Sequence, residues 1–125
     1  MSRPRILLTR RWPAPVEAAL AAEFDATFNP ADQALDSAAL RQALRDFDAV
    51  LPTVSDRIDA AVFDLDAPRV RILANYGVGY GHIDLAAARA RGIAVTNTPG
   101  VLTDATADLT MTLLLMAARR AGEGE

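Results

Sequence analysis

The sequence contains no cysteine, one histidine and few aromatic residues, which make up 6% of its 125 positions. Without cysteine the chain has no disulfide and no thiolate metal site, and it suits a reducing compartment. Long apolar runs are also lacking: the longest, residues 111–118, contains Thr112 and falls far short of the ~20 residues that span a bilayer. The basic start is followed by only three apolar residues, too few for a signal-peptide core. We therefore expect a cytoplasmic protein without a membrane segment.

An excess of positive charge is absent as well. Lysine and arginine total 13 against 16 aspartates and glutamates, which gives a formal net charge of −3. This balance argues against a nucleic-acid binder, because phosphate contacts need a basic surface. With 51% hydrophobic and 23% charged residues, the composition is that of an ordinary globular protein, and residues 1–125 are expected to form a single domain.

Short β-favouring segments alternate with segments of helical periodicity along the chain. Strands are expected at residues 5–9, 26–30, 49–52, 70–74 and 93–96. Helices are expected from residue 15, from Asp36 or Ser37 as N-cap, at 58–63, at 84–91 with Gly92 after its end, and from residue 103. This alternation predicts an α/β fold with a doubly wound, five-stranded parallel sheet, and the flavodoxin-like strand order 2-1-3-4-5 follows by analogy.

A glycine-rich turn, GVGYG at residues 77–81, stands between the fourth expected strand and the next helix. Its spacing is GxGxG, whereas a dinucleotide fingerprint is GxGxxG, and no acidic residue ends the following strand to bind a ribose. Such a turn can instead offer consecutive backbone N–H groups to a small anion such as a carboxylate. Alternatively, the glycines only permit a tight turn, with Asp84 capping the helix.

Residues 75–84, NYGVGYGHID, and residues 92–108, GIAVTNTPGVLTDATAD, closely resemble the D-isomer-specific 2-hydroxyacid dehydrogenases, particularly their glyoxylate and hydroxypyruvate reductase branch. The resemblance covers the whole chain as an N-terminal, substrate-binding part. It implies a small 2-oxo or 2-hydroxy acid, such as glyoxylate or hydroxypyruvate, as substrate. It also implies NAD or NADP as the cofactor of the full-length family.

Carried over position by position, the resemblance implies that the backbone amides of Val78 and Gly79 bind the substrate carboxylate. It implies that Thr103 touches the nicotinamide and that Asn75, with Tyr76, shapes and braces the turn. Without the resemblance, Tyr76 could equally be a core residue with a satisfied hydroxyl. The substrate-binding residues implied in this way are Tyr76, Gly77, Val78, Gly79 and the loop residues Thr53 and Val54.

In that family the catalytic Arg, Glu and His belong to a cofactor domain with a true glycine fingerprint, or lie beyond it. That cofactor domain is not in these 125 residues, so we expect no catalytic residue, no cofactor bound to this chain alone, and a truncated or engineered fragment that is inactive by itself. His82 does not match the catalytic histidine position. It is expected to be a local turn or surface residue.

The final expected helix is apolar nearly all round, which is typical of a helix buried on several sides. Residues 103–121 resemble the helix that crosses between domains in the family. Thr103 is a candidate N-cap, and Asp104 and Asp108 place negative charge in the first turns, so they indicate no metal site. We expect this helix either to fold back onto its own sheet or to dock on a second copy as a homodimer.

Two alternatives stand beside the enzyme fragment. A stand-alone flavodoxin-like module would be a receiver-type signalling domain or a flavin carrier. A receiver needs an acid pair after the first strand, where Arg10 and Arg11 stand, and a flavin carrier needs a hydroxyl-rich phosphate loop there. The other alternative is a half-protein that was made to test whether this lobe folds alone. The sequence does not distinguish this hypothesis from that of an enzyme fragment.

Overall fold

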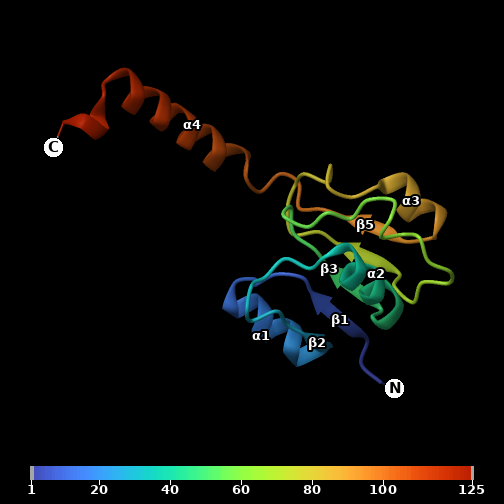
Figure 1. The fold of residues 1–125 in the computed structure, drawn as a ribbon. Coiled ribbons are helices and arrows are strands. Elements are labelled where there is room, and N and C mark those ends of the chain that lie inside the picture. Colours follow the sequence, from blue (N-terminus) through green and yellow to red (C-terminus); the bar gives the residue numbers. More distant parts are fainter. Residues whose placement is uncertain (1, 125) are drawn as a thin grey trace.

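The computed structural model describes residues 2–124 and contains a five-stranded sheet in the order β2-β1-β3-β4-β5 (Figure 1). Every neighbouring pair of strands is parallel. The strands are β1 (Arg5–Leu8), β2 (Asp25–Thr27), β3 (Ala49–Leu51), β4 (Ile72–Ala74) and β5 (Ala94–Thr96). The predicted α/β class, parallel sheet and strand order are confirmed. Because all strands run the same way, the loops after them meet at one edge of the sheet.

The helices are α1 (Ala14–Glu23), α2 (Ser37–Asp46), α3 (Leu85–Ala90) and α4 (Thr103–Ala118), followed by the short 3-10 helix η1 (Ala121–Glu123). Aspartates cap α2 and α3: the carboxylate of Asp36 accepts from the Ala39 N–H at 2.7 Å, and that of Asp84 from the Ala87 N–H at 2.9 Å. Gly92, just past α3, has a φ of +69°. These three local signals were read correctly from the sequence because capping depends on near neighbours.

The helix predicted at 58–63 is wrong. The segment forms turns, and Ile58 makes a parallel bridge with Ile83 instead. The backbone N–H groups of residues 62–64 donate to the carbonyls three residues before them, at 3.0, 3.2 and 3.3 Å, so these are turn bonds and not the i→i+4 bonds of an α-helix. The backbone of Ile58 is also engaged across the chain, since its N–H donates to the His82 carbonyl at 2.9 Å. The segment is therefore held by turn bonds and by its pairing with residues 82–84.

Two hydrophobic clusters cover the two faces of the sheet. The larger joins α2 and α3 to β3 and β4, and it contains Val50 and Leu73, which are fully buried. The smaller joins α1 to β1 and is built around Ile6 and Leu8. Alternate residues of β1 thus point to opposite faces, as in a sheet covered on both sides. The packing fixes the sheet that carries the loops described below.

Helix α4 runs away from the sheet (Figure 1), and every residue from Thr103 to Ala118 is exposed. The prediction that this helix is buried on several sides is wrong for the single chain, and it does not fold back onto its own sheet. The cap prediction is also off by one position: Leu102 is the N-cap, Thr103 is the first helical residue, and no side chain caps the helix. Among residues 2–124, no helix has both the length and the apolar character that crossing a membrane requires.

Candidate functional site

The glycine turn lies at the edge of the sheet where the strands end, after β4. The loop after β3 runs beside it: Thr53 makes a parallel bridge with Tyr76, and the Tyr76 N–H donates to the Pro52 carbonyl at 2.8 Å. This edge is where open parallel sheets bind ligands. The sequence elements predicted to flank a substrate, residues 53–54 and 76–79, are therefore adjacent in the fold.

Two asparagine side chains brace the turn from the protein side. The Nδ2 of Asn75 donates to the carbonyls of Gly77, at 3.1 Å, and Gly79, at 2.9 Å. The Nδ2 of Asn97, just after β5, donates to the Val78 carbonyl at 2.9 Å. Three consecutive carbonyls of the turn are thereby held by the surrounding structure. Asn75 itself is buried, with 3% of its surface exposed.

The braced carbonyls determine where the amides of the turn point. The Gly77 carbonyl also accepts from the Thr98 N–H at 3.1 Å. In a trans peptide the C=O of one residue and the N–H of the next point in opposite directions, and the described chain contains no cis peptide. The N–H groups of Val78, Gly79 and Tyr80 consequently point away from the braces. Within residues 2–124 these three N–H groups donate to no protein acceptor.

Gly77 is required by close packing. A Cβ at this position would lie 2.6 Å from Cγ1 of Val54 and 3.4 Å from Nδ2 of Asn75. Its φ of +157° also lies where side-chain-bearing residues are rare. At Gly79, in contrast, an added Cβ meets nothing within 4 Å. The first glycine lets the loop after β3 approach the turn, and the second leaves space in front of the amides.

A cavity of about 440 Å³ lies in front of the turn. Apolar side chains of Val54, Val101 and Leu102 form much of its wall. An apolar pocket with a few converging polar groups is the usual form of a small-molecule site. The lining residues are Val54, Tyr76, Gly77, Val78, Gly79, Thr98, Val101 and Leu102.

Five of the six predicted substrate-binding residues line this cavity, and the sixth, Thr53, lies behind it in the bridge with Tyr76. Thr103 lines a neighbouring hollow of about 490 Å³, which shares Val78 and Leu102 with the first. The residue predicted to touch a nicotinamide thus lies next to the residues predicted to hold the substrate. Thr98, Val101 and Leu102 were not predicted as lining residues, because they come from the segment between β5 and α4.

Tyr76 packs against Trp12, the only tryptophan, with ring centroids 4.8 Å apart and a tilt of 43° between the planes. The tyrosine is 45% exposed, so the alternative that it is a core residue is wrong. The Trp12 Nε1 is buried and has no partner among the described residues. Trp12 follows β1 closely, and its place beyond the carboxyl end of a strand is the signal in the sequence that could have identified it.

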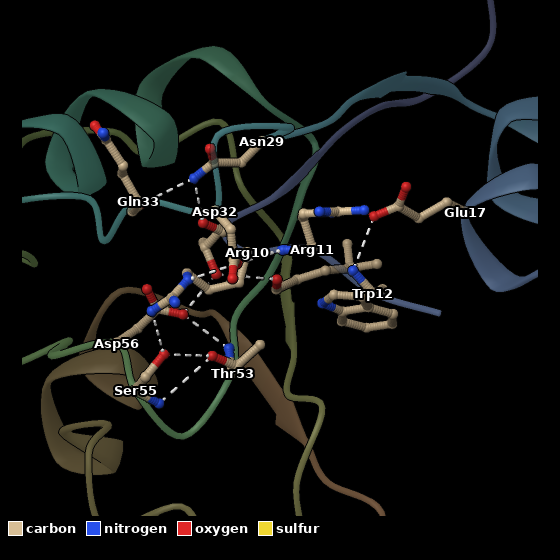
Figure 2. A network of polar contacts seen from close by, with 12 residues as sticks. Arg10, Arg11, Trp12, Glu17, Asn29, Asp32, Gln33, Thr53, Ser55 and Asp56 are labelled. Atoms are coloured by element: carbon tan, nitrogen blue, oxygen red, sulfur yellow. Dashed lines mark hydrogen bonds and ion pairs between the residues drawn. The ribbon is translucent and has the colours of Figure 1, made fainter. Parts of the chain in front are cut away.

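A polar network ties the end of β1 to the loop after β3 (Figure 2). The Oδ2 of buried Asp56 accepts from the Thr9 hydroxyl at 2.5 Å and from the Thr53 N–H at 2.8 Å. The Thr53 hydroxyl contacts that of Ser55 at 2.8 Å, and Arg10 donates to the Ser55 hydroxyl at 2.9 Å. Asp56 therefore fixes the backbone of Thr53, beside the cavity. The sequence alone did not indicate this network.

Arg10 continues the network to the loop after β2 (Figure 2). Its Nε donates to the Asp32 carboxylate at 2.9 Å, and the Arg11 N–H donates to the same oxygen at 3.0 Å. These bonds hold the pKa of Asp32 below its ordinary value, and the contact with Asp32 raises the pKa of Arg10. The two arginines after β1 thus bind the loops after β2 and β3 to the end of β1 at this edge of the sheet.

His82 lies in the turn, as predicted, and is half-buried. Its Nε2 is 2.9 Å from the Oδ1 of Asn75, a contact that the sequence did not suggest. Burial lowers the pKa of His82 from its ordinary value, and the nearby negative charge of Asp56 acts weakly in the opposite direction. At neutral pH the ring is therefore uncharged.

The turn does not fit a dinucleotide pyrophosphate. The helix that follows it, α3, has six residues, and the carboxylate of Asp84 lies at its N-terminus, where it accepts from the Ala87 N–H. A pyrophosphate at that point would meet the like charge of this carboxylate. Among the described residues 2–124, no group of three or more His, Asp or Glu side chains converges to hold a metal ion.

Residues 6–121 match the family model described as "D-isomer specific 2-hydroxyacid dehydrogenase, catalytic domain". The glyoxylate reductase of Thermococcus kodakarensis is 47% identical over 123 residues, which is 98% of this chain and 37% of the relative. That of Thermococcus gammatolerans is 45% identical over 123 residues, 98% of this chain and 36% of the relative. The chain thus spans little more than a third of the length of these relatives.

Solved structures show the same fold. A Thermus thermophilus protein is 46% identical and superposes with a TM-score of 0.79, over 96% of this chain and 38% of its own. The NADPH-dependent glyoxylate/hydroxypyruvate reductase of Sinorhizobium meliloti, in complex with NADP and malonate, is 36% identical with a TM-score of 0.72, over 92% of this chain and 34% of its own. From its sheet, its glycine turn and these matches, the chain belongs to the D-isomer specific 2-hydroxyacid dehydrogenase family.

Proposed function

We propose that this chain is the substrate-binding domain of a cytoplasmic, NAD(P)-dependent D-2-hydroxyacid dehydrogenase acting on small 2-oxo or 2-hydroxy acids such as glyoxylate or hydroxypyruvate. One observation carries the proposal: the N–H groups of Val78, Gly79 and Tyr80 are free of protein acceptors among residues 2–124 and are held by braces on their opposite side. Consecutive, fixed N–H groups beside a cavity are suited to a carboxylate. The relatives named as glyoxylate reductases support the choice of acid.

The chemistry of the site follows from its residues. A carboxylate at the amides accepts charge-assisted hydrogen bonds, each worth about 1.5–3 kcal/mol. The apolar wall at Val54, Val101 and Leu102 excludes water from the rest of a small acid. Thr103, in the adjoining hollow, would face the nicotinamide, which supplies the hydride when it is bound.

Proton and hydride transfer require the family's catalytic Arg, Glu and His and its cofactor domain, and no residue in 1–125 matches these. We therefore propose that the chain binds the acid weakly and is inactive alone. Mixing it with glyoxylate or hydroxypyruvate and NADH or NADPH should leave the absorbance of the reduced cofactor constant. Cofactor oxidation above the protein-free rate would refute the proposed division of labour.

Binding can be tested directly with oxalate, an unreactive small dicarboxylate, by ¹H–¹⁵N NMR on the labelled chain. Saturable shifts confined to the amides of Val78, Gly79 and Tyr80 are expected. The neutral isostere oxamide, which lacks a carboxylate, is the matched control and should produce none. Uniform or absent shifts with oxalate would contradict the proposed carboxylate site.

We also propose that the segment 103–121, which contains helix α4, is covered by a second copy of the chain in a homodimer. All but one of its large apolar side chains are more than half exposed, for example Leu109 at 58%, Leu113 at 56% and Leu114 at 60%. A contiguous apolar surface of this kind is a common mark of an association site. Light scattering at increasing protein concentration should report a dimer, and a strictly monomeric species at high concentration would exclude it.

A further inference from the structure

A chain of hydrogen bonds connects His82 to the backbone of the glycine turn. The imidazole Nε2 is 2.9 Å from Oδ1 of Asn75, and the Nδ2 of the same asparagine reaches the carbonyls of Gly77 and Gly79. The asparagine is buried, so water does not replace these partners freely. The ring is therefore connected through one residue, Asn75, to two peptides of the glycine turn.

The chemistry of the groups determines the direction of each bond. The two carbonyls can only accept, so the end of the Asn75 side chain that faces them must be the NH₂ group. Its oxygen then faces His82, and an oxygen needs a donor. The uncharged ring must accordingly carry its proton on Nε2. If the amide of Asn75 were rotated by half a turn, its oxygen would face two carbonyl oxygens and both braces would be lost.

The backbone that carries His82 is fixed by its neighbours. The His82 carbonyl accepts from the Ile58 N–H at 2.9 Å, and the next residue, Ile83, is buried and bridges Ile58. The Asp84 N–H donates to the Ile58 carbonyl at 2.9 Å. The backbone of His82 is thus held by the segment that was predicted to be a helix, and the contact with Asn75 sets the direction of its ring.

We propose that His82 is a positioning residue for the carboxylate-binding turn: its Nε2–H fixes the Asn75 amide, which holds the Gly77 and Gly79 carbonyls and so aims the amides that follow them at the cavity. The inference rests on the proposed function for its biological meaning. His82 does not contact the substrate position and transfers no proton in this role. It acts through Asn75, whose side chain accepts one hydrogen bond from the imidazole and donates to two peptide carbonyls of the turn.

Two measurements on the full 125-residue chain test this role. The first is the ¹⁵N spectrum of the unmodified His82 ring above its pKa, which should show the Nε2–H tautomer. The second is oxalate binding followed at the Val78 and Tyr80 amides, which follow the two carbonyls that Asn75 holds. His82→Leu removes the donor and should weaken binding about fivefold or more, as expected for one lost hydrogen bond. His82→Gln keeps an N–H donor and should stay within about twofold of the unmodified chain.

Gln42→Leu is the matched control, because Gln42 is an α2 residue whose side chain pairs with Asp46, far from the turn, and it should bind oxalate normally. An Nδ1–H tautomer, or His82→Leu binding as tightly as the unmodified chain, would overturn the role of His82 while leaving the proposed function standing. If the unmodified chain binds no oxalate, the proposed function fails instead. An Nδ1–H tautomer then still overturns the inference, without any variant that could misfold.

Discussion

The indole of Trp12 and the phenol ring of Tyr76 lie with centroids 4.8 Å apart, joining the end of β1 to the turn after β4. Trp12 also packs on the cluster that contains Ile6 and Leu8. Since Trp12 is the only tryptophan, its fluorescence should report on the turn. Oxalate binding should change this emission, and Tyr76→Leu should change it without ligand.

Replacing Trp12 tests how much this contact stabilises the fold. Trp12→Leu should lower the free energy of unfolding by about 1–3 kcal/mol, because a large partly buried ring is lost. Trp12→Phe keeps an aromatic partner for Tyr76 and should lose less. Urea unfolding followed by circular dichroism measures both, and equal losses for the two variants would contradict a specific ring contact.

The two glycines of the turn should respond differently to alanine. Gly77→Ala brings a methyl group 2.6 Å from Cγ1 of Val54 and should lower the free energy of unfolding by about 1–3 kcal/mol. Gly79→Ala finds open space and should change stability by less than about 1 kcal/mol while weakening oxalate binding. Urea unfolding and NMR titration separate the two effects. A stable Gly77→Ala with normal binding would contradict the described packing.

The buried carboxylate of Asp56 depends on the Thr9 hydroxyl. Thr9→Val keeps the shape but removes the donor, and it should lower the free energy of unfolding by about 1–3 kcal/mol. Thr9→Ser retains the hydroxyl and should cost less. Thermal unfolding provides the comparison. Because Asp56 also holds the Thr53 N–H, hydrogen exchange of that amide should accelerate in Thr9→Val and remain slow in Thr9→Ser.

The lowered pKa of His82 has a consequence for stability against pH. The unfolded chain, where the ring has its ordinary pKa of 6.5, binds a proton more readily than the folded chain. The stability that His82 contributes is therefore fully present above pH 6.5. It is lost as the pH falls from 6.5 toward the pKa of His82 in the folded chain. Urea unfolding from about pH 7.5 to about pH 5 should show this decline relative to His82→Gln, and parallel profiles would contradict it.

Association through α4 should depend on its apolar side chains. Leu113→Glu with Leu114→Glu puts charge on two residues that are 56% and 60% exposed. The free energy of unfolding of the sheet should change by less than about 0.5 kcal/mol, because these residues do not contribute to its core. Light scattering should shift from dimer to monomer. Thr110→Glu with Thr112→Glu, an equal change in charge at hydroxyl-bearing positions of the same helix, is the control and should have a smaller effect.

Local chemistry in the sequence was enough to predict most elements of this fold. Asp36 and Asp84 cap their helices and Gly92 ends α3, because each of these signals acts over a few residues. For the turn at 77–81, the glycine spacing and the missing acid predict that it is not a dinucleotide loop. The strand order required analogy with known folds, since short apolar strands do not specify their neighbours.

Only the tertiary structure decided which groups surround the glycine turn. Asn97 reaches Val78 and Thr9 reaches Asp56 because parallel strands place distant loops at one edge, and side-chain spacing along the chain does not record that arrangement. Residues 58–63, predicted to be a helix, instead form turns, and Ile58 at their start pairs with residues 82–84 for the same reason. The turn was visible in the sequence as a set of glycines, but the direction of its amides depends on the asparagines that hold its carbonyls.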